Sequence, residues 1–444
     1  MEAVDSRWKL AVSFLVAAVA AASMWFYVDR ILVGYQMADA AAHERPRGNL
    51  SDLYPRWLGA RELLLHRRNP YSDEIAVEIQ KGYYGRALDP ARPNDPKDRQ
   101  GFAYPVYVVF LLAPLIRLPF HGVQIFFHWL LLGLTAASVG LWLRVLRWRL
   151  TAAGIAVAVV LTLGSFPFVQ GIKLQQLSLL VAAILAGAAA CVASGFFFCG
   201  GALLALATIK PQLAWPLVAW LLLWAGSDWR ARRKLVFGFG VVMALLLAGA
   251  EYEMPGWWRM FAQAIAQYHQ YTQNQSVLQV LIEGLLGSAG GGGVGRIGAE
   301  LLAAIAVLVC GMVLWKLRKE PAEGAGFGRA AGLVMALTLV IVPMSAPYNQ
   351  ILLLPTILLL VRERAAFLGS RSPARRLAYW VGVMVVGWQW VASLLLTGID
   401  LFVSQARAFE GWKWPFFTTF AIPVVVFGLM FMAAMGRQAG DAVR

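Results

Sequence analysis

Apolar segments that recur from the start of the chain almost to its end are the feature that most limits how this sequence can fold. Hydrophobic residues make up 59% of the 444 and charged residues only 14%, far from the balance of a soluble globular protein. A helix needs about 20 apolar residues to cross the hydrocarbon core of a bilayer. The sequence therefore predicts one all-α polytopic integral membrane domain over residues 1–444, with about 11 to 13 transmembrane helices.

Basic residues gather in short clusters between the apolar segments, and these clusters predict the topology. Lys and Arg near span ends are retained on the cytoplasmic side. The N-terminus is then cytoplasmic, and two large loops, 29–102 and 251–297, are periplasmic in a bacterial inner membrane. Because the net charge of +15 is explained in this way, no nucleic-acid partner is expected. The predicted spans lie near 10–28, 122–143, 152–165, 177–193, 197–209, 212–226, 234–250, 298–315, 328–343, 349–361, 377–395 and 416–435.

One apolar segment, Tyr104–Phe120, does not suit a transmembrane helix. It is short, it holds three prolines, and Arg117 would be expensive in hydrocarbon. We expect a broken or juxtamembrane helix there. The first apolar run could pass for a secretory signal, but its length favours an uncleaved anchor. The three cysteines lack metal-ligand spacing, so packing is the expected role and no metal site is predicted.

The polar loop 29–102 is where the sequence places function. Within it, Leu53–Leu65 has apolar residues at helical spacing, which predicts an amphipathic helix lying on the membrane surface with Arg56, Arg61, Glu62 and Arg67 facing away. Asp52 precedes this helix, and Pro55 falls in its first turn. Two roles for Asp52 stay open on spacing alone: a helix N-cap, or a catalytic base facing a lipid-borne substrate.

Other polar residues at the outer ends of spans also allow two interpretations. Lys210, beside Pro211, could bind a phosphate or snorkel to the interface. His269 could contact substrate or simply lie on the surface, and the aromatic residues around it are typical of an interfacial belt that could also stack on sugar. Asp98, in a proline-rich stretch with Asp89 and Asp95, is typical of a solvated loop.

Several short motifs, in order along residues 10–360, resemble glycosyltransferase family 87, polyprenyl-phosphate-dependent enzymes of the GT-C superfamily. Each motif is weak alone, and their order and outward placement carry the resemblance. The motifs are Ser51-Asp52-Leu53-Tyr54, Arg68-Asn69-Pro70-Tyr71, Phe102-Ala103-Tyr104-Pro105 with Pro114 and Leu118-Pro119, Gly171 with Gln175 and Gln176, Ile209-Lys210-Pro211-Gln212, Asn274-Gln275-Ser276 and Ser345-Ala346-Pro347-Tyr348-Asn349.

The resemblance implies a GT-C-like bundle with periplasmic juxtamembrane helices, and an aspartate in the first outer loop as general base, the position of Asp52. It implies an inverting transfer of one sugar, of the mannose or arabinose class, from a polyprenyl phosphate to a lipid or glycan acceptor, with no cofactor or metal indicated. The sequence departs from the family at Val169–Lys173, where Gly-Gln is expected in succession, and this weakens any role for Gln170 or Gln175. The expected substrate-binding residues are Lys210, Lys173, Arg56, Gln212, His269, Tyr348 and Asn349.

Two other function classes remain compatible with the sequence. A transporter or flippase of lipid-linked sugars would favour ionisable groups and broken helices near the bilayer midplane, whereas most charges here lie in loops. A polymerase or ligase that uses a lipid-diphosphate donor would share the basic outer pocket. Turnover with synthetic polyprenyl-monophosphate sugars separates these classes.

Overall fold

The computed structural model describes residues 2–49, 51–272, 275–287, 293–343 and 346–441, and these contain helices but no strands. Two residues of the motifs above, Asn274 and Ser345, lie outside the described part of the chain. Six described segments are long and apolar enough to cross a membrane, and a bent pair of helices makes a possible seventh. The chain is therefore an all-α polytopic membrane protein, as the sequence predicts.

The long segments are distributed along the whole chain. The first, Leu10–Ala42, contains most of α1 (Glu2–Phe26), a π-helical turn (Tyr27–Leu32) and α2 (Val33–Ala42). The last, Gln405–Met435, contains α20 (Gln405–Glu410), α21 (Trp414–Thr419) and most of α22 (Ala421–Asp441). The other four are α6 (Phe120–Val145), α12 (Trp229–Glu253), α15 (Gly293–Leu317) and α19 (Pro373–Phe402).

Shorter helices fill the space between the long ones. α7 (Ala152–Leu163) and α8 (Phe166–Lys173) meet at an angle of 56° and form the bent pair. Because the remaining ones are shorter than a bilayer-spanning helix requires, the number of crossings stays a prediction. They are α9 (Leu177–Ala193), α10 (Phe197–Ala207), α11 (Pro211–Gly226), α14 (Val277–Leu286), α16 (Ala325–Ile341), a 3-10 segment (Pro347–Leu353), α17 (Leu354–Arg362) and α18 (Arg364–Leu368).

The core of the bundle lies around α9 and α16, whose side chains are buried on nearly every face. Small residues allow the close packing that this requires. At the crossing of α10 and α12, a Cβ on Gly201 would lie 2.0 Å from the carbonyl oxygen of Leu235, and a Cβ on Gly238 would lie 2.1 Å from that of Phe198. Glycine at these two positions is therefore what lets the two backbones touch.

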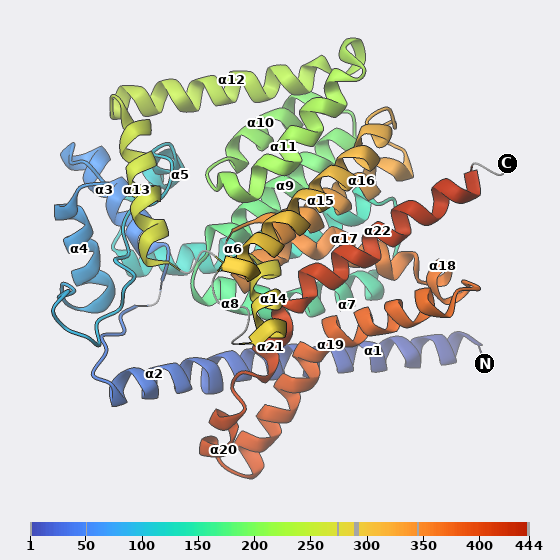
Figure 1. Ribbon diagram of the computed structural model, residues 1–444, viewed down its shortest axis with the longest axis horizontal. Coiled ribbons are helices and arrows are strands. Elements are labelled where there is room, and N and C mark those ends of the chain that lie inside the picture. Colours follow the sequence, from blue (N-terminus) through green and yellow to red (C-terminus); the bar gives the residue numbers. More distant parts are fainter. Residues whose placement is uncertain (1, 50, 273–274, 288–292, 344–345, 442–444) are drawn as a thin grey trace.

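The first polar loop folds into a cap at the end of the molecule opposite both termini, beside α13 (Trp257–Tyr271) (Figure 1). The cap contains α3 (Tyr54–His66), α4 (Asp73–Tyr84) and α5 (Val108–Leu112). A 3-10 turn, Ala113–Leu115, follows α5, so Tyr104–Phe120 is a broken helix, as predicted. α3 packs against both α4 and α5.

The structure corrects the prediction for two side chains of α3 and excludes one of the two roles left open for Asp52. Arg56 and Glu62 do not face away, because α4 and α5 cover the helix on the side where solvent was expected. Glu62 is buried and accepts a hydrogen bond from Arg68 at 2.8 Å, while Arg56 turns inward. Asp52 is not the N-cap either, because the helix begins one residue later and its N-cap, Leu53, makes no side-chain capping bond. The Asp52 carboxylate is thus available for another partner.

Candidate active site

A pocket of about 360 Å³ lies where the cap meets the N-terminal ends of α9 and α11. This volume is within the range of small-ligand sites. Residues from the first loop, from α13 and from the segment before the 3-10 turn at Pro347 converge on it. The lining residues are Asp52, Arg56, Asp98, Gln100, Gly101, Ala103, Tyr104, Pro105, Gln176, Ile209, Lys210, Pro211, Gln212, Phe261, Ile265, Tyr268, His269, Val342, Pro343 and Tyr348.

The break between α8 and α9 holds Asp52 in place. The Asp52 amide donates to the carbonyl of Leu174 at 2.9 Å, and the Ser51 hydroxyl donates to the side-chain oxygen of Gln175 at 2.5 Å. Gln175 has a φ of 50°, in the left-handed region, which is how the chain turns from α8 into α9. Because of this turn, the Leu174 carbonyl makes no hydrogen bond within a helix, and it accepts the hydrogen bond from the Asp52 amide instead.

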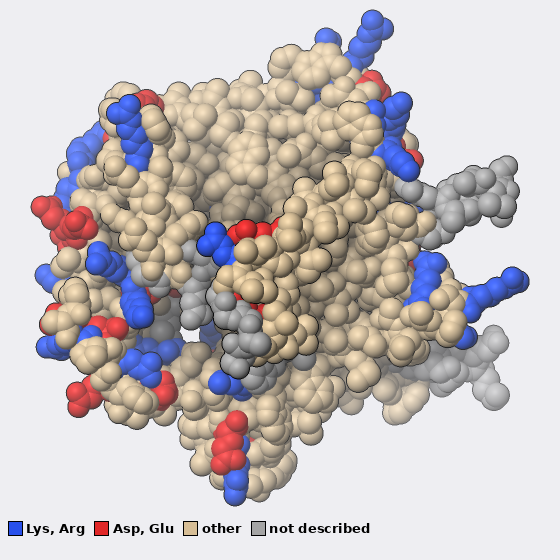
Figure 2. Space-filling view, in the orientation of Figure 1, with Lys and Arg blue, Asp and Glu red and all other residues tan. Residues whose placement is uncertain are grey.

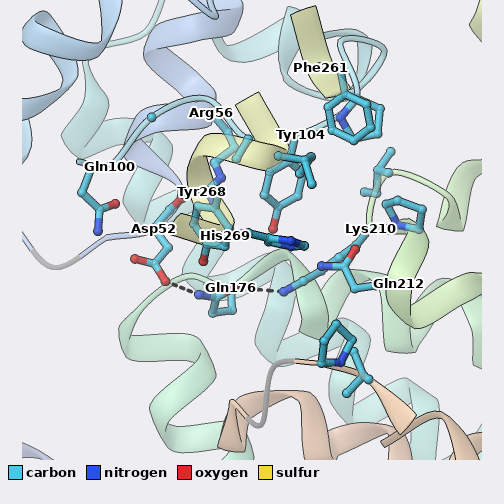
Figure 3. A pocket seen from close by; sticks show the side chains of 18 of the residues that line it. Asp52, Arg56, Gln100, Tyr104, Gln176, Lys210, Gln212, Phe261, Tyr268 and His269 are labelled. Carbon is cyan, nitrogen blue, oxygen red and sulfur yellow. Dashed lines mark hydrogen bonds between the residues drawn. The ribbon is translucent and has the colours of Figure 1, made fainter. Parts of the chain in front are cut away.

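Gln176 connects the two charged sides of the pocket (Figure 3). It is the N-cap residue of α9, yet its side chain makes no capping bond. Its amide nitrogen instead donates to the Asp52 carboxylate, and its amide oxygen faces the Lys210 ammonium at 3.4 Å. The amide orientation follows from charge, since the N–H dipole meets an anion and the C=O dipole meets a cation.

Lys210 is buried at the N-cap of α11, where Pro211 occupies the first helical position. Its ammonium donates to the Ser178 hydroxyl at 2.5 Å and lies 5.1 Å from the centre of the Tyr348 ring. Ser178 in turn donates to the side-chain oxygen of Asn349 at 2.7 Å. These contacts satisfy part of the ammonium's capacity and fix its direction, so the simple snorkelling interpretation does not describe this lysine.

Arg56 approaches from α3. It donates to the backbone carbonyl of Asp52 at 2.6 Å, and its guanidinium lies 4.5 Å from the centre of the Tyr104 ring. Its Nε is buried and has no hydrogen-bond partner among the described residues. A cation held beside a carboxylate and under an aromatic ring retains donors that can face a ligand.

Burial sets the protonation of the acidic groups in the pocket. Loss of solvent raises the pKa of Asp52 to about 6; Arg56 opposes the rise, and the negative charge of Asp98 adds to it. Burial also raises the pKa of Asp98, which accepts from the Gln100 amide at 2.9 Å. The loop that contains Asp89, Asp95 and Asp98 is largely exposed, as predicted, but Asp98 is only partly exposed and lines the pocket.

The structure brings most of the predicted site residues together. Asp52, Arg56, Lys210, Gln212, His269 and Tyr348 all line the pocket. Asn349 does not, because its buried side chain is turned to Ser178 behind the wall. Lys173 does not either: its ammonium forms an ion pair with Asp29 and lies 5.5 Å from the centre of the Trp25 ring. Both Lys173 partners belong to the first membrane helix, away from the cap.

Sequence reasoning did not single out Gln176, Ser178, Asp98 or Gln100 as functional residues. Of these four residues only Gln176 occurs in one of the motifs, and nothing in the sequence indicates that it contacts Asp52. Phe261 and Tyr268 are two of the aromatic residues around His269 for which the sequence left open an interfacial belt or stacking on sugar, and both line the pocket from α13. Among the described residues no group of three or more His, Cys, Asp and Glu side chains is arranged to hold a metal ion.

Comparison with protein families matches residues 102–343 to Glycosyltransferase family 87. The match covers the part of the pocket that contains Gln176, Lys210 and Tyr268, while Asp52 and Arg56 precede it. A comparison with curated proteins gives no match, and neither does a comparison with solved structures. The match extends over more than half of the sequence. The chain is therefore a membrane glycosyltransferase and belongs to glycosyltransferase family 87.

Proposed function

We propose that this enzyme moves a single sugar, of the mannose or arabinose class, from a polyprenyl phosphate to a lipid or glycan acceptor with inversion at the anomeric carbon. One observation carries the proposal. A carboxylate and an ammonium group, Asp52 and Lys210, stand on opposite sides of the Gln176 amide in one pocket. That arrangement matches a displacement that needs a proton acceptor on one side and a stabilised phosphate on the other.

The proposed reaction is a single displacement. The acceptor hydroxyl oxygen attacks the anomeric carbon, Asp52 takes the hydroxyl proton, and the bond between the anomeric carbon and the phosphate oxygen breaks. The bonding electron pair leaves with the polyprenyl phosphate. Because the phosphate is already a good leaving group, no general acid is required, and one carboxylate is enough. Attack opposite the leaving group inverts the configuration.

Positive charge at the other side of the pocket suits the phosphate. Lys210 supplies an ammonium, and the N-termini of α9 and α11 face the same space with the positive ends of their dipoles. Arg56 adds a second cation next to Asp52. The phosphate gains negative charge as it leaves, so these groups stabilise the transition state more than the bound donor.

We place the pocket on the periplasmic side of a bacterial inner membrane, with the N-terminus in the cytoplasm. In Figure 2 the end that holds both termini shows mainly Lys and Arg with few acidic side chains, whereas the end with the cap carries many side chains of both signs. Retention of basic residues in the cytoplasm supports this orientation. A polyprenyl phosphate presented at the outer face would then meet Lys210 at the depth of its phosphate.

The test is Asp52→Asn in purified enzyme with a synthetic polyprenyl-monophosphate sugar. The asparagine amide retains a side-chain oxygen for the Gln176 amide but cannot serve as a base near neutral pH. Turnover should fall by about 100 to 10,000-fold, with donor binding retained. Asp89→Asn, an exposed change in the same loop that does not line the pocket, is the matched control.

Three outcomes would contradict the proposal. Near-normal turnover by Asp52→Asn would move the base elsewhere, first to Asp98. Turnover only with a polyprenyl-diphosphate donor would replace the proposed donor class. Retention of configuration in the product, measured by NMR of the new glycosidic bond, would exclude the proposed single displacement with inversion.

A further inference from the structure

A second cavity, of about 790 Å³, lies inside the membrane part of the molecule between α1, α7, α17, α19 and α22. Its wall is almost entirely apolar, with Ala158, Ile357, Val386 and Gly387 among its lining residues. It shares no described lining residue with the catalytic pocket. An apolar space of this kind is poorly filled by water, and leaving it empty forfeits packing contacts along its apolar walls.

The cavity has a polar end, which lies on the side of the molecule that holds both termini. Leu10 near the start of α1, Trp148 before α7 and Arg364 after α17 mark this end. Tyr379, on α19, is 8% exposed there and near enough to Arg364 for an electrostatic interaction. Among the described residues no carboxylate forms an ion pair with Arg364, whose guanidinium donates to the Val361 carbonyl at 3.4 Å.

Further positive charge surrounds this mouth. Arg375 lies with its guanidinium 5.0 Å from the centre of the Phe367 ring, and that ring stacks on Tyr379 at 5.2 Å. Arg362 donates to the Leu146 carbonyl, next to the wall residue Trp148. Three arginines of the basic cluster that the sequence explains only as a topology signal therefore lie at this mouth or beside it: Arg364 lines the cavity, and Arg362 and Arg375 contact residues next to its wall.

We propose that this cavity binds an anionic phospholipid from the leaflet on the side of the termini. The acyl chains fill the apolar space, and the phosphate faces Arg364 with the Tyr379 hydroxyl as a second donor. The occupant must be apolar over most of its length and anionic at one end, and it must reach the site from within the bilayer. A phospholipid meets all three conditions, and anionic lipids are attracted to basic segments at this face.

Two variants test the proposal in protein purified in detergent and then titrated with phosphatidylglycerol or phosphatidylcholine. Gly387→Phe places a ring into the cavity at a position where an added Cβ meets nothing within 4 Å. Arg364→Gln removes the charge at the mouth. Gly133→Phe, on α6, has the same open surroundings outside the cavity lining and is the control. Lipid retained per protein is counted by native mass spectrometry, and Tm is measured alongside.

Wild type and Gly133→Phe should retain phosphatidylglycerol and gain Tm with it. Gly387→Phe should lose both effects, and Arg364→Gln should bind phosphatidylglycerol about tenfold or more weakly, because a hydrogen bond to a charged group contributes on that order. Equal retention by all variants would overturn the proposal. So would a Gly387→Phe enzyme that turns over a short-chain donor normally and a long-chain donor poorly, which would assign the cavity to the isoprenoid chain instead.

These results are distinguishable from a failure of the proposed function, because lipid retention and Tm need no turnover. An enzyme that is inactive with every polyprenyl-phosphate sugar could still bind phosphatidylglycerol in this cavity. Equal titration curves for phosphatidylglycerol and phosphatidylcholine in the wild type would reject the anionic headgroup.

Discussion

At the scale of single residues, Gln176 explains how a carboxylate and an ammonium coexist in one small pocket without neutralising each other. In a direct ion pair with each other, Asp52 and Lys210 would both be less able to interact with the substrate as base and as phosphate-binding cation. The Gln176 amide lies between them, donating to one and facing the other with its oxygen. Each charged group thus keeps a face for substrate, and burial keeps the Asp52 pKa high enough for proton transfer near neutral pH.

The pKa of Asp52 predicts an acid limb in the pH profile. Since the base must be ionised, kcat/KM in the free enzyme should fall as pH drops through about 6. Asp98→Asn removes a charge that raises this pKa and should move the limb to lower pH, whereas Arg56→Gln should move it to higher pH. A profile that stays flat to pH 5, or one that both variants shift in the same direction, would contradict the assignment.

The same pKa has a consequence for stability. A carboxyl group whose folded pKa lies above its unfolded value stabilises the fold when protonated, and that contribution is lost as pH rises from about 4 to about 6. Asp52→Asn removes the buried charge, so at pH 7.5 its Tm should equal or exceed that of the wild type. A Tm well below wild type would show that the ionised carboxylate holds the fold together, which would weaken the case for a base.

Lys210 and Lys173 form a matched pair for testing the phosphate side. Lys210→Ala should weaken donor binding and lower kcat, because the same charge serves the bound phosphate and the leaving group. Lys173→Ala should leave donor binding unchanged, since Asp29 and Trp25 hold that ammonium outside the pocket. Titration of each variant with donor, followed by single-turnover kinetics, measures both effects. Equal losses in the two variants would mean that the pocket is not the donor site.

At the scale of elements, the site depends on helices that stop inside the bundle. α8 ends at Lys173, and α9 begins a few residues later at Leu177, so backbone and side-chain polar groups are exposed where a continuous span would hide them. α11 likewise begins at Pro211, which places Lys210 at a helix end. In a membrane, non-helical backbone is tolerated only where its N–H and C=O groups find hydrogen-bond partners in protein or in a polar cavity. The catalytic pocket is such a cavity.

The crossing of α10 and α12 gives a prediction for the elements that carry this arrangement. Gly201→Ala puts a Cβ 2.0 Å from the Leu235 carbonyl, so the helices must separate, at a cost of about 1–3 kcal/mol. Gly240→Ala, on α12, meets nothing within 4 Å and is the control. Thermal unfolding in detergent, followed by tryptophan fluorescence, should show a lower Tm for Gly201→Ala alone. Equal melting of the two variants would indicate that the crossing is looser than described.

At the scale of the whole molecule, function depends on which end faces which side of the membrane. The cap with the pocket lies opposite both termini (Figure 1), so one orientation fixes the location of the active site. The native cysteines Cys191, Cys199 and Cys310 are free thiols and must be replaced before labelling. In that background, exposed positions at the two ends report the orientation directly.

We predict that Lys81→Cys, an exposed position on α4, reacts with a membrane-impermeant thiol reagent in intact cells. Arg371→Cys, an exposed position between α18 and α19, should react only after the membrane is permeabilised. The reverse pattern would place the pocket in the cytoplasm and would require a donor that faces inward. Gln80, one residue earlier, is unsuitable for labelling because it is buried.

The sequence by itself determined the class of fold, because apolar segment length and basic clusters act locally and need no knowledge of what packs on what. The motifs that resemble the family also pointed to Asp52, Arg56, Lys210, Gln212, His269 and Tyr348, which line the pocket, and to Lys173 and Asn349, which do not. The tertiary structure alone decided which of these residues meet. It turned Arg56 inward, tied Lys173 to Asp29 and placed Asp98 in the pocket wall. The bridge through Gln176 joins residues 124 and 34 positions apart. Such contacts depend on how helices cross, and no local pattern encodes the crossing.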